Sequence, residues 1–183
     1  MNKPHDARQD ARRLDLLRLA DDAAALDGHW PLTDLPRLTS DAAPAGDGQV
    51  HWRVEGERRA VAGAAADPML QLQARAAVRL TCQRCLQPVD EALVVARSFR
   101  FVADEAEAER LDEDVDDEDV LALPPRGRLD LLPLVEDELI LAVPLVPRHE
   151  TCPEPLPLPE DTLEAPAEEH PFAALAALKQ PKP

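Results

Sequence analysis

The sequence has no tyrosine, and its 183 residues include only three phenylalanines and two tryptophans. Aromatic side chains bury the most apolar area each, so a core made chiefly of Leu, Val and Ala is expected to be modest. Six glycines stand against 19 prolines, which indicates that part of the chain is extended and unpacked.

Long apolar segments are also missing. No run of about 18 apolar residues is present, so no membrane-spanning helix is expected. The first twenty residues are charged throughout and no apolar stretch follows, which argues against a secretory signal and predicts a cytoplasmic location. Glycine-rich phosphate loops, nucleophile elbows and Ser/His/Asp arrangements are absent, so neither enzyme activity nor a small-molecule substrate is expected.

The charge is acidic but unevenly distributed. The formal net charge is −16, and a wholly acidic surface is repelled by RNA phosphates. Between Leu70 and Val102, however, five arginines accompany only two acidic residues. Residues 103–122 then contain eleven acidic residues and one arginine. A local basic surface is therefore compatible with the acidic whole.

The N-terminal part predicts helices and then a strand. Leucines and alanines at helical spacing favour a helix over residues 7–27, and a second short helix is expected from Thr33. Residues 41–48 have the Gly, Pro and Asp content of a loop. Residues 49–58 alternate between apolar and polar, which predicts a strand.

The central part predicts a long antiparallel hairpin. Residues 69–81 and 88–102 both alternate, and they flank the segment that contains Cys82 and Cys85, so the cysteines are expected at the hairpin tip. Residues 103–122 are expected to be a flexible acidic loop, too charged to pack. Residues 129–143 then predict a helix that packs on the sheet, with Asp130 as its N-cap.

We therefore predict an α+β fold: a mainly antiparallel sheet with a long hairpin, N-terminal helices and one packing helix. Residues 1–152 form a single domain, with a disordered acidic loop, and residues 153–183 form a Pro/Glu-rich tail. Within the tail, residues 171–179 form a short amphipathic motif that is too short to be stable alone. Its apolar residues are predicted to dock on a partner or on the domain itself: Phe172, Leu175 and Leu178.

The three cysteines are the sharpest chemical signal. An odd number forms no disulfide framework, and in a reducing compartment a close Cys pair indicates metal binding or redox chemistry. Cys82 and Cys85 can hold one side of a tetrahedral zinc ion, and His149 and Cys152 can complete it. Two alternatives remain open: reduced thiols in a turn, or a thiol-redox protein that uses the Cys82/Cys85 pair.

The arginines around the hairpin can contact RNA phosphates, or they can be an ordinary solvated face. Alternation places Arg75 and Arg79 on one face of a strand. The full candidate set is Arg75, Arg79, Arg84, Arg97 and Arg100.

Three segments in order resemble the YceD family of large ribosomal RNA accumulation proteins. They are residues 80–88 (LTCQRCLQP), residues 129–149 with Cys152 just beyond, and residues 171–179. The resemblance implies a non-catalytic ribosome biogenesis factor needed for synthesis, processing or accumulation of 23S rRNA. It implies large-subunit rRNA, or a pre-ribosomal particle and its basic proteins, as partners. It supplies no catalytic residue, and zinc is the cofactor that the cysteine motif admits.

Overall fold

The computed structural model describes residues 11–60, 65–112 and 118–154. They form a six-stranded sheet in the order β2-β4-β5-β6-β7, and β3 pairs with the end of β5 beyond β4. Neighbouring strands are antiparallel except β7, which runs parallel to β6. The strands are β2 (Ala25–Pro31), β3 (Ala43–Pro44), β4 (Gln49–Arg59), β5 (Asp67–Thr81), β6 (Pro88–Val102) and β7 (Asp119–Ala122).

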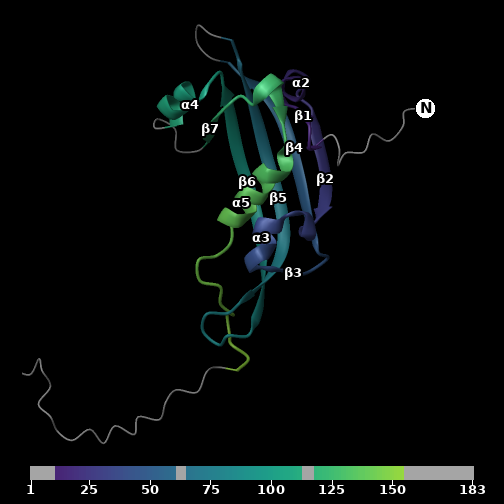
Figure 1. Ribbon diagram of the computed structural model, residues 1–183, viewed down its shortest axis with the longest axis vertical. Helices are drawn as coiled ribbons and strands as arrows, with labels where there is room; N and C mark the ends of the chain where they lie inside the picture. The colour runs from purple at the N-terminus through teal and green to yellow at the C-terminus, as the bar shows by residue number, and fades with distance from the viewer. Residues whose placement is uncertain (1–10, 61–64, 113–117, 155–183) are drawn as a thin grey trace, which may run out of the picture.

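The long hairpin is confirmed, and it forms the centre of the sheet (Figure 1). Its alternating residues are directed to opposite faces, because successive side chains of a strand point to opposite sides. Leu70 lies beside Phe99, and Ala74 lies beside Val95, all of them buried. The strand predicted over 49–58 is also confirmed as β4. The α+β class with a mainly antiparallel sheet follows from these pairings.

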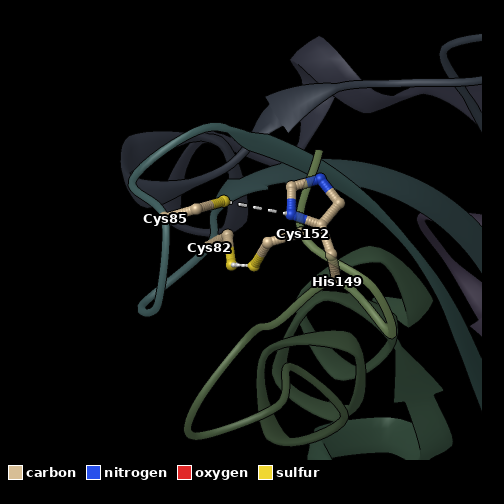
Figure 2. Close-up of side chains that lie close together, drawn as sticks. All are labelled: Cys82, Cys85, His149 and Cys152. Carbon is tan, nitrogen blue, oxygen red and sulfur yellow. Dashed lines mark hydrogen bonds between the residues drawn. The ribbon is translucent and has the colours of Figure 1, made fainter. Parts of the chain in front are cut away.

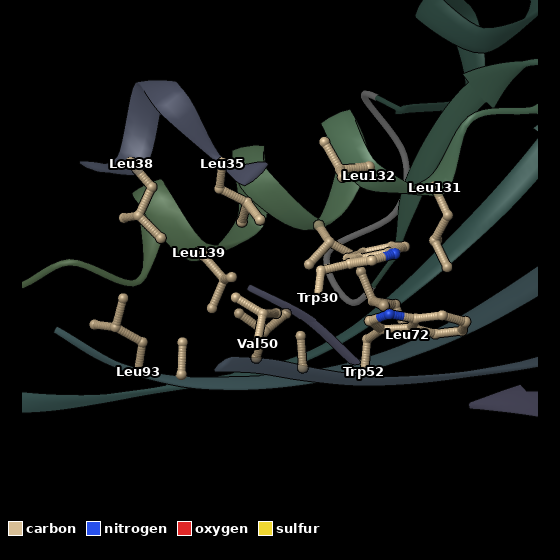
Figure 3. Packing of buried hydrophobic residues seen from close by; sticks show 14 of the residues in the cluster. Trp30, Leu35, Leu38, Val50, Trp52, Leu72, Leu93, Leu131, Leu132 and Leu139 are labelled. Atoms are coloured by element: carbon tan, nitrogen blue, oxygen red, sulfur yellow. The ribbon is translucent and has the colours of Figure 1, made fainter. Parts of the chain in front are cut away.

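Helices cover the buried face of the sheet. They are α2 (Leu16–Asp21), α3 (Pro36–Asp41) and α5 (Leu131–Leu141), with 3-10 turns at Leu32–Asp34 and Pro125–Gly127. Asp130 caps α5 as predicted, since its side chain accepts a hydrogen bond from the Leu132 N–H. Leu131 and Leu139 of α5 point toward the sheet (Figure 3). There Trp30 stacks on Trp52 with ring centroids 4.8 Å apart.

The helix predicted over residues 7–27 is wrong for residues 12–15 and 22–27, whereas residues 7–10 lie outside the described part of the chain. β1 (Leu14–Asp15) pairs with β8 (Arg128–Leu129), and between Arg12 and the start of β2 the α-helix spans Leu16–Asp21. Ala11, the first described residue, is also helical. Asp15 starts the helix by accepting from the Arg18 N–H, and Ala23, with φ of 45°, follows its end. The alanines favour a helix locally, but pairing with β4 along all of β2 outweighs that small preference.

The acidic segment 103–122 was predicted to be disordered, and this is wrong for its described residues. It contains α4 (Glu105–Asp112) and β7. Asp104 accepts from the Glu107 N–H at the start of α4, where acidic residues also favour the helix dipole. Ala108 packs with Val102 and Val120 in a small second cluster. Leu111 also packs against this cluster, and β7 pairs with β6, so the described part of the segment has regular structure despite its charge.

Most of the predicted tail, including the motif at 171–179, lies outside the described residues. In the described part of the chain, no helix has both the length and the apolar character needed to cross a bilayer.

Candidate metal centre

A tight turn at the hairpin tip brings Cys82 and Cys85 together. The Leu86 N–H donates to the Cys82 carbonyl at 2.9 Å, and the Cys82 N–H donates to the Gln87 carbonyl at 2.9 Å. Leu86 adopts φ of 61°, a left-handed conformation that lets the chain reverse within these few residues. Both cysteines are buried although they lie at the tip of a hairpin.

The segment after α5 supplies the other two residues of the cluster. It is fastened to the tip because the Gln83 N–H donates to the Pro147 carbonyl at 2.9 Å. The Cys152 Sγ lies 3.9 Å from the Cys82 Sγ, and the His149 Nδ1 lies 3.4 Å from the Cys85 Sγ (Figure 2). The four candidate ligand atoms all lie within 4.8 Å of one another.

These separations fit a tetrahedral zinc site. With Zn–S near 2.3 Å and Zn–N near 2.0 Å, tetrahedral ligands are separated by about 3.8 Å for S···S and about 3.5 Å for S···N. Three thiolates and an imidazole are also the donor set that zinc prefers. The cysteines are free of disulfides, so all three sulfurs remain available as ligands. The cluster is consistent with a zinc site made by the residues predicted from the sequence.

A second contact of His149 indicates which of its two ring nitrogens can bind a metal. The His149 Nε2 lies 2.9 Å from the Pro88 carbonyl oxygen, which can only accept, so Nε2 carries the proton. In the neutral imidazole, the Nδ1 atom that faces Cys85 then carries a free lone pair that can bind a metal. Such outer contacts are usual for metal-binding histidines. The role of Pro88 was missed in the sequence, because a backbone carbonyl leaves no signal in the residue pattern.

The electrostatics of the cluster favour a thiolate at Cys82 and a neutral thiol at Cys85. Burial acts to raise the pKa of the Cys82 thiol. Hydrogen bonds from the backbone of His149, Arg84 and Cys85 outweigh that effect and lower this pKa to about 5. Burial and the neighbouring sulfurs raise the pKa of Cys85. A divalent cation among the three sulfurs would stabilise all of them as thiolates.

Arg84 contacts the residues of the metal cluster, whereas the other four hairpin arginines lie elsewhere on the sheet. Its Nε donates to the Cys152 Sγ at 2.9 Å, and its Nη2 donates to the His149 carbonyl at 3.1 Å. The guanidinium therefore offsets sulfur charge and holds the segment after α5 against the tip.

The remaining arginines do not share one surface. Arg75 and Arg79 are exposed on the sheet face opposite the helices, and Arg79 is bonded to Asp90 at 2.6 Å and 2.9 Å. Arg97 lies on the helix-covered face, and Arg100 is largely buried beside Asp67. Arg75 has no ion pair among the residues that the structure describes. RNA contact by this set stays a prediction.

Comparison with known proteins adds independent information. The family model described as "Large ribosomal RNA subunit accumulation protein YceD" matches residues 70–179. The chain belongs to the YceD family. A curated relative with that same description, from Haemophilus influenzae, is 39% identical over 111 residues, which span 56% of this chain and 60% of the relative. No solved structure matches the chain.

The YceD match contains all four residues of the metal cluster as well as β5, β6 and α5. It begins at β5, so the N-terminal helices and β2 to β4 lie outside it. It also reaches the end of the amphipathic motif at residue 179. The hairpin, the cluster and this motif are thus features that the family model covers.

Proposed function

We propose that this protein is a non-catalytic, cytoplasmic ribosome biogenesis factor needed for the synthesis, processing or accumulation of 23S rRNA in the large subunit. The observation that carries the proposal is the YceD family match over residues 70–179. The relative from Haemophilus influenzae, whose description names large-subunit rRNA accumulation, supports it.

The chemistry of the cluster supports a non-catalytic role. Catalytic zinc sites keep an open position for water or substrate, whereas structural sites use four protein ligands. The cluster offers four ligands from the chain itself: Cys82, Cys85, His149 and Cys152. A metal held by all four would fasten the hairpin tip to the segment after α5 and leave no position for chemistry.

The proposed partners are large-subunit rRNA, or a precursor particle and its basic proteins. Arg75 is the best candidate for a phosphate contact, because it is exposed and has no ion pair within the described ranges. Arg53 is a matched control on the neighbouring strand, since its guanidinium is already bonded to Glu55 at 2.8 Å. Arg75→Glu is expected to reduce cosedimentation with large-subunit precursors more than Arg53→Glu does.

The decisive experiment compares mature large- and small-subunit rRNA in cells with and without this protein. A selective fall in 23S rRNA, restored by the wild-type chain, is the expected result. An unchanged ratio would refute the proposed function, and the thiol chemistry of Cys82 and Cys85 would then be the first alternative to examine.

We also propose that the cluster binds one structural zinc ion. Metal analysis of the purified full chain is expected to give about one zinc per chain, and Cys82→Ser should lose it. Gln83→Ala is the matched control, since Gln83 lies in the same turn and its side chain is no ligand. A strong chelator is expected to lower the thermal midpoint of the wild type and to leave Cys82→Ser unaffected.

Metal-free protein whose cysteines react at once with an alkylating reagent would contradict the zinc proposal. That result would favour the thiol-redox alternative. Slow alkylation that becomes fast after chelation would instead support zinc, because bound thiolates are protected.

A further inference from the structure

One edge of the sheet is left open along most of β6. β5 pairs with the inner edge of β6 over Pro88–Arg100, whereas β7 pairs with the outer edge only from Phe99 to Val102 (Figure 1). Within the described ranges, no backbone hydrogen bond reaches the outer edge between Val89 and Ser98. An unpaired edge presents a row of N–H and C=O groups that can receive another strand.

The middle of this edge lacks the usual protection, although Asp90, Glu91 and Arg97 flank it. Natural proteins guard free edges with lysine, proline, bulges or charges that interrupt the strand. The five residues Ala92–Ala96 (ALVVA) contain no charge, proline or glycine. Val94 at the centre is 74% exposed. Such an edge would promote self-association unless a partner covers it.

A groove runs beside this edge, with apolar residues on both sides. Val94 and Ala96 line it from β6, and Leu141 and Ala142 line it from the end of α5. Leu141 is 76% exposed although it is a large apolar residue. An added strand directs alternate side chains to opposite faces, so one set would meet Val94 and the other Leu141.

The charge of the region indicates which kind of strand fits. Arg97 lines the groove and is already bonded to Asp119 at 2.6 Å and to Glu138 at 3.5 Å. Arg75, on β5, lies beside Val94 on the face of the sheet opposite α5. Glu91, at the other end of the edge, has no ion pair with any described residue. A second copy of this chain would bring another formal charge of −16, so electrostatic complementarity favours a basic partner.

We propose that the outer edge of β6, from Val89 to Ser98, binds an extended basic segment of a partner protein as an additional strand. Main-chain hydrogen bonds supply affinity in this mode of recognition, and alternate side chains supply specificity. The inference goes beyond the proposed function. Strand binding at this edge does not depend on the proposed function. The identity of the partner as a basic protein of the large subunit does depend on it.

The test uses the purified full-length chain and a labelled peptide of about nine residues in which lysine and valine alternate. Binding is measured by fluorescence anisotropy near physiological salt, where long-range attraction is screened. The same peptide with N-methylated backbone amides keeps its side chains and charge but cannot donate main-chain hydrogen bonds. The unmodified peptide is expected to bind at least about tenfold more tightly, a difference of about 1.4 kcal/mol.

Two groove variants and one matched control locate the site. Val94→Lys and Leu141→Lys are each expected to weaken binding about tenfold. Leu145→Lys adds the same charge at a fully exposed leucine that does not line the groove, and it should change binding by less than about twofold. Hydrogen exchange should show new protection of amides in residues 89–98 when the peptide is added. Unchanged thermal midpoints establish that the variants are folded.

Three results would overturn the proposal. The methylated peptide could bind as tightly as the unmodified one, or Leu145→Lys could weaken binding as much as the two groove variants do. Either result would mean that the peptide is attracted to the acidic surface in general. No binding at all would mean that the edge is not a docking site for such a strand. A wild-type dimer that Val94→Lys dissociates would assign the edge to a second copy of the chain. Unchanged rRNA in cells lacking the protein would refute the proposed function without altering these measurements.

Discussion

Glu136 is a buried carboxylate that joins α5 to α3. It is 3% exposed, and its side chain accepts from the Arg37 N–H at 2.7 Å and from the Leu38 N–H at 3.2 Å. The Arg37 Nε donates to the same carboxylate at 3.0 Å. Residue Leu35, which precedes α3, makes no side-chain cap, so a residue about a hundred positions away performs that role.

Glu136→Ala is expected to lower the free energy of unfolding by about 3 kcal/mol, because buried N–H groups lose a charged acceptor. Glu136→Gln should lose less, since its amide oxygen can still accept one hydrogen bond. Urea unfolding of the full chain measures both.

The neighbouring carboxylate provides the control. Asp137 also bonds Arg37, at 2.6 Å, but both side chains are about half exposed. Asp137→Ala should therefore cost less than about 1 kcal/mol. Similar losses for the two alanine variants would show that Glu136 acts only as an ordinary surface ion pair.

At the scale of the elements, the close approach of α2 to β4 depends on Gly56. A Cβ atom at this position would lie 2.6 Å from the Leu19 carbonyl carbon and oxygen and 2.8 Å from the Ala20 nitrogen. These are backbone atoms, which cannot rotate away as the end of a side chain can. The Gly56 N–H also donates to the Ala24 carbonyl at 2.9 Å.

Gly56→Ala is expected to destabilise the fold by about 1–3 kcal/mol, because α2 must move away from the sheet. Glu57→Ala, at the next and exposed position of β4, should change stability by less than about 0.5 kcal/mol. Thermal unfolding followed by circular dichroism compares the two variants. A Gly56→Ala protein as stable as the wild type would mean that α2 repacks at no cost.

The elements also show which sequence patterns were reliable. The period-two pattern of 69–81 and 88–102 predicted β5 and β6 correctly, because one long face of each strand is buried. The leucines and alanines of 7–27 predicted one continuous helix, whereas the described residues 14–27 form the short strand β1, the helix α2 and the first part of β2. The acidic content of 103–122 concealed α4 and β7, which depend on the few apolar residues around Ala108.

At the scale of the whole molecule, the segment after α5 runs from this helix to the hairpin tip and precedes residues 155–183 in the sequence. The cluster of Cys82, Cys85, His149 and Cys152 lies where this segment meets the hairpin tip. Residues 171–179 lie beyond it, outside the described residues, and the family model extends to their end. Docking by Phe172, Leu175 and Leu178 remains a prediction.

Replacing Phe172, Leu175 and Leu178 together by alanine is expected to reduce 23S rRNA accumulation in complemented cells to the level of a deletion of 171–183. Lys179→Ala, in the same motif, should retain wild-type accumulation, because the apolar residues are the proposed contacts. Full accumulation with the triple variant would remove the motif from the proposed function.

The sequence by itself determined the α+β class, the central hairpin, the Asp130 cap and the four residues of the candidate metal centre. Each of these depends on a short pattern: alternation, a capping residue or the spacing of cysteines. Only the tertiary structure decided that Glu136 caps α3, that Arg84 bonds Cys152, and that the outer edge of β6 is unpaired. Those features join residues distant in the chain, and local patterns carry no information about which distant backbone or side-chain group will lie beside them.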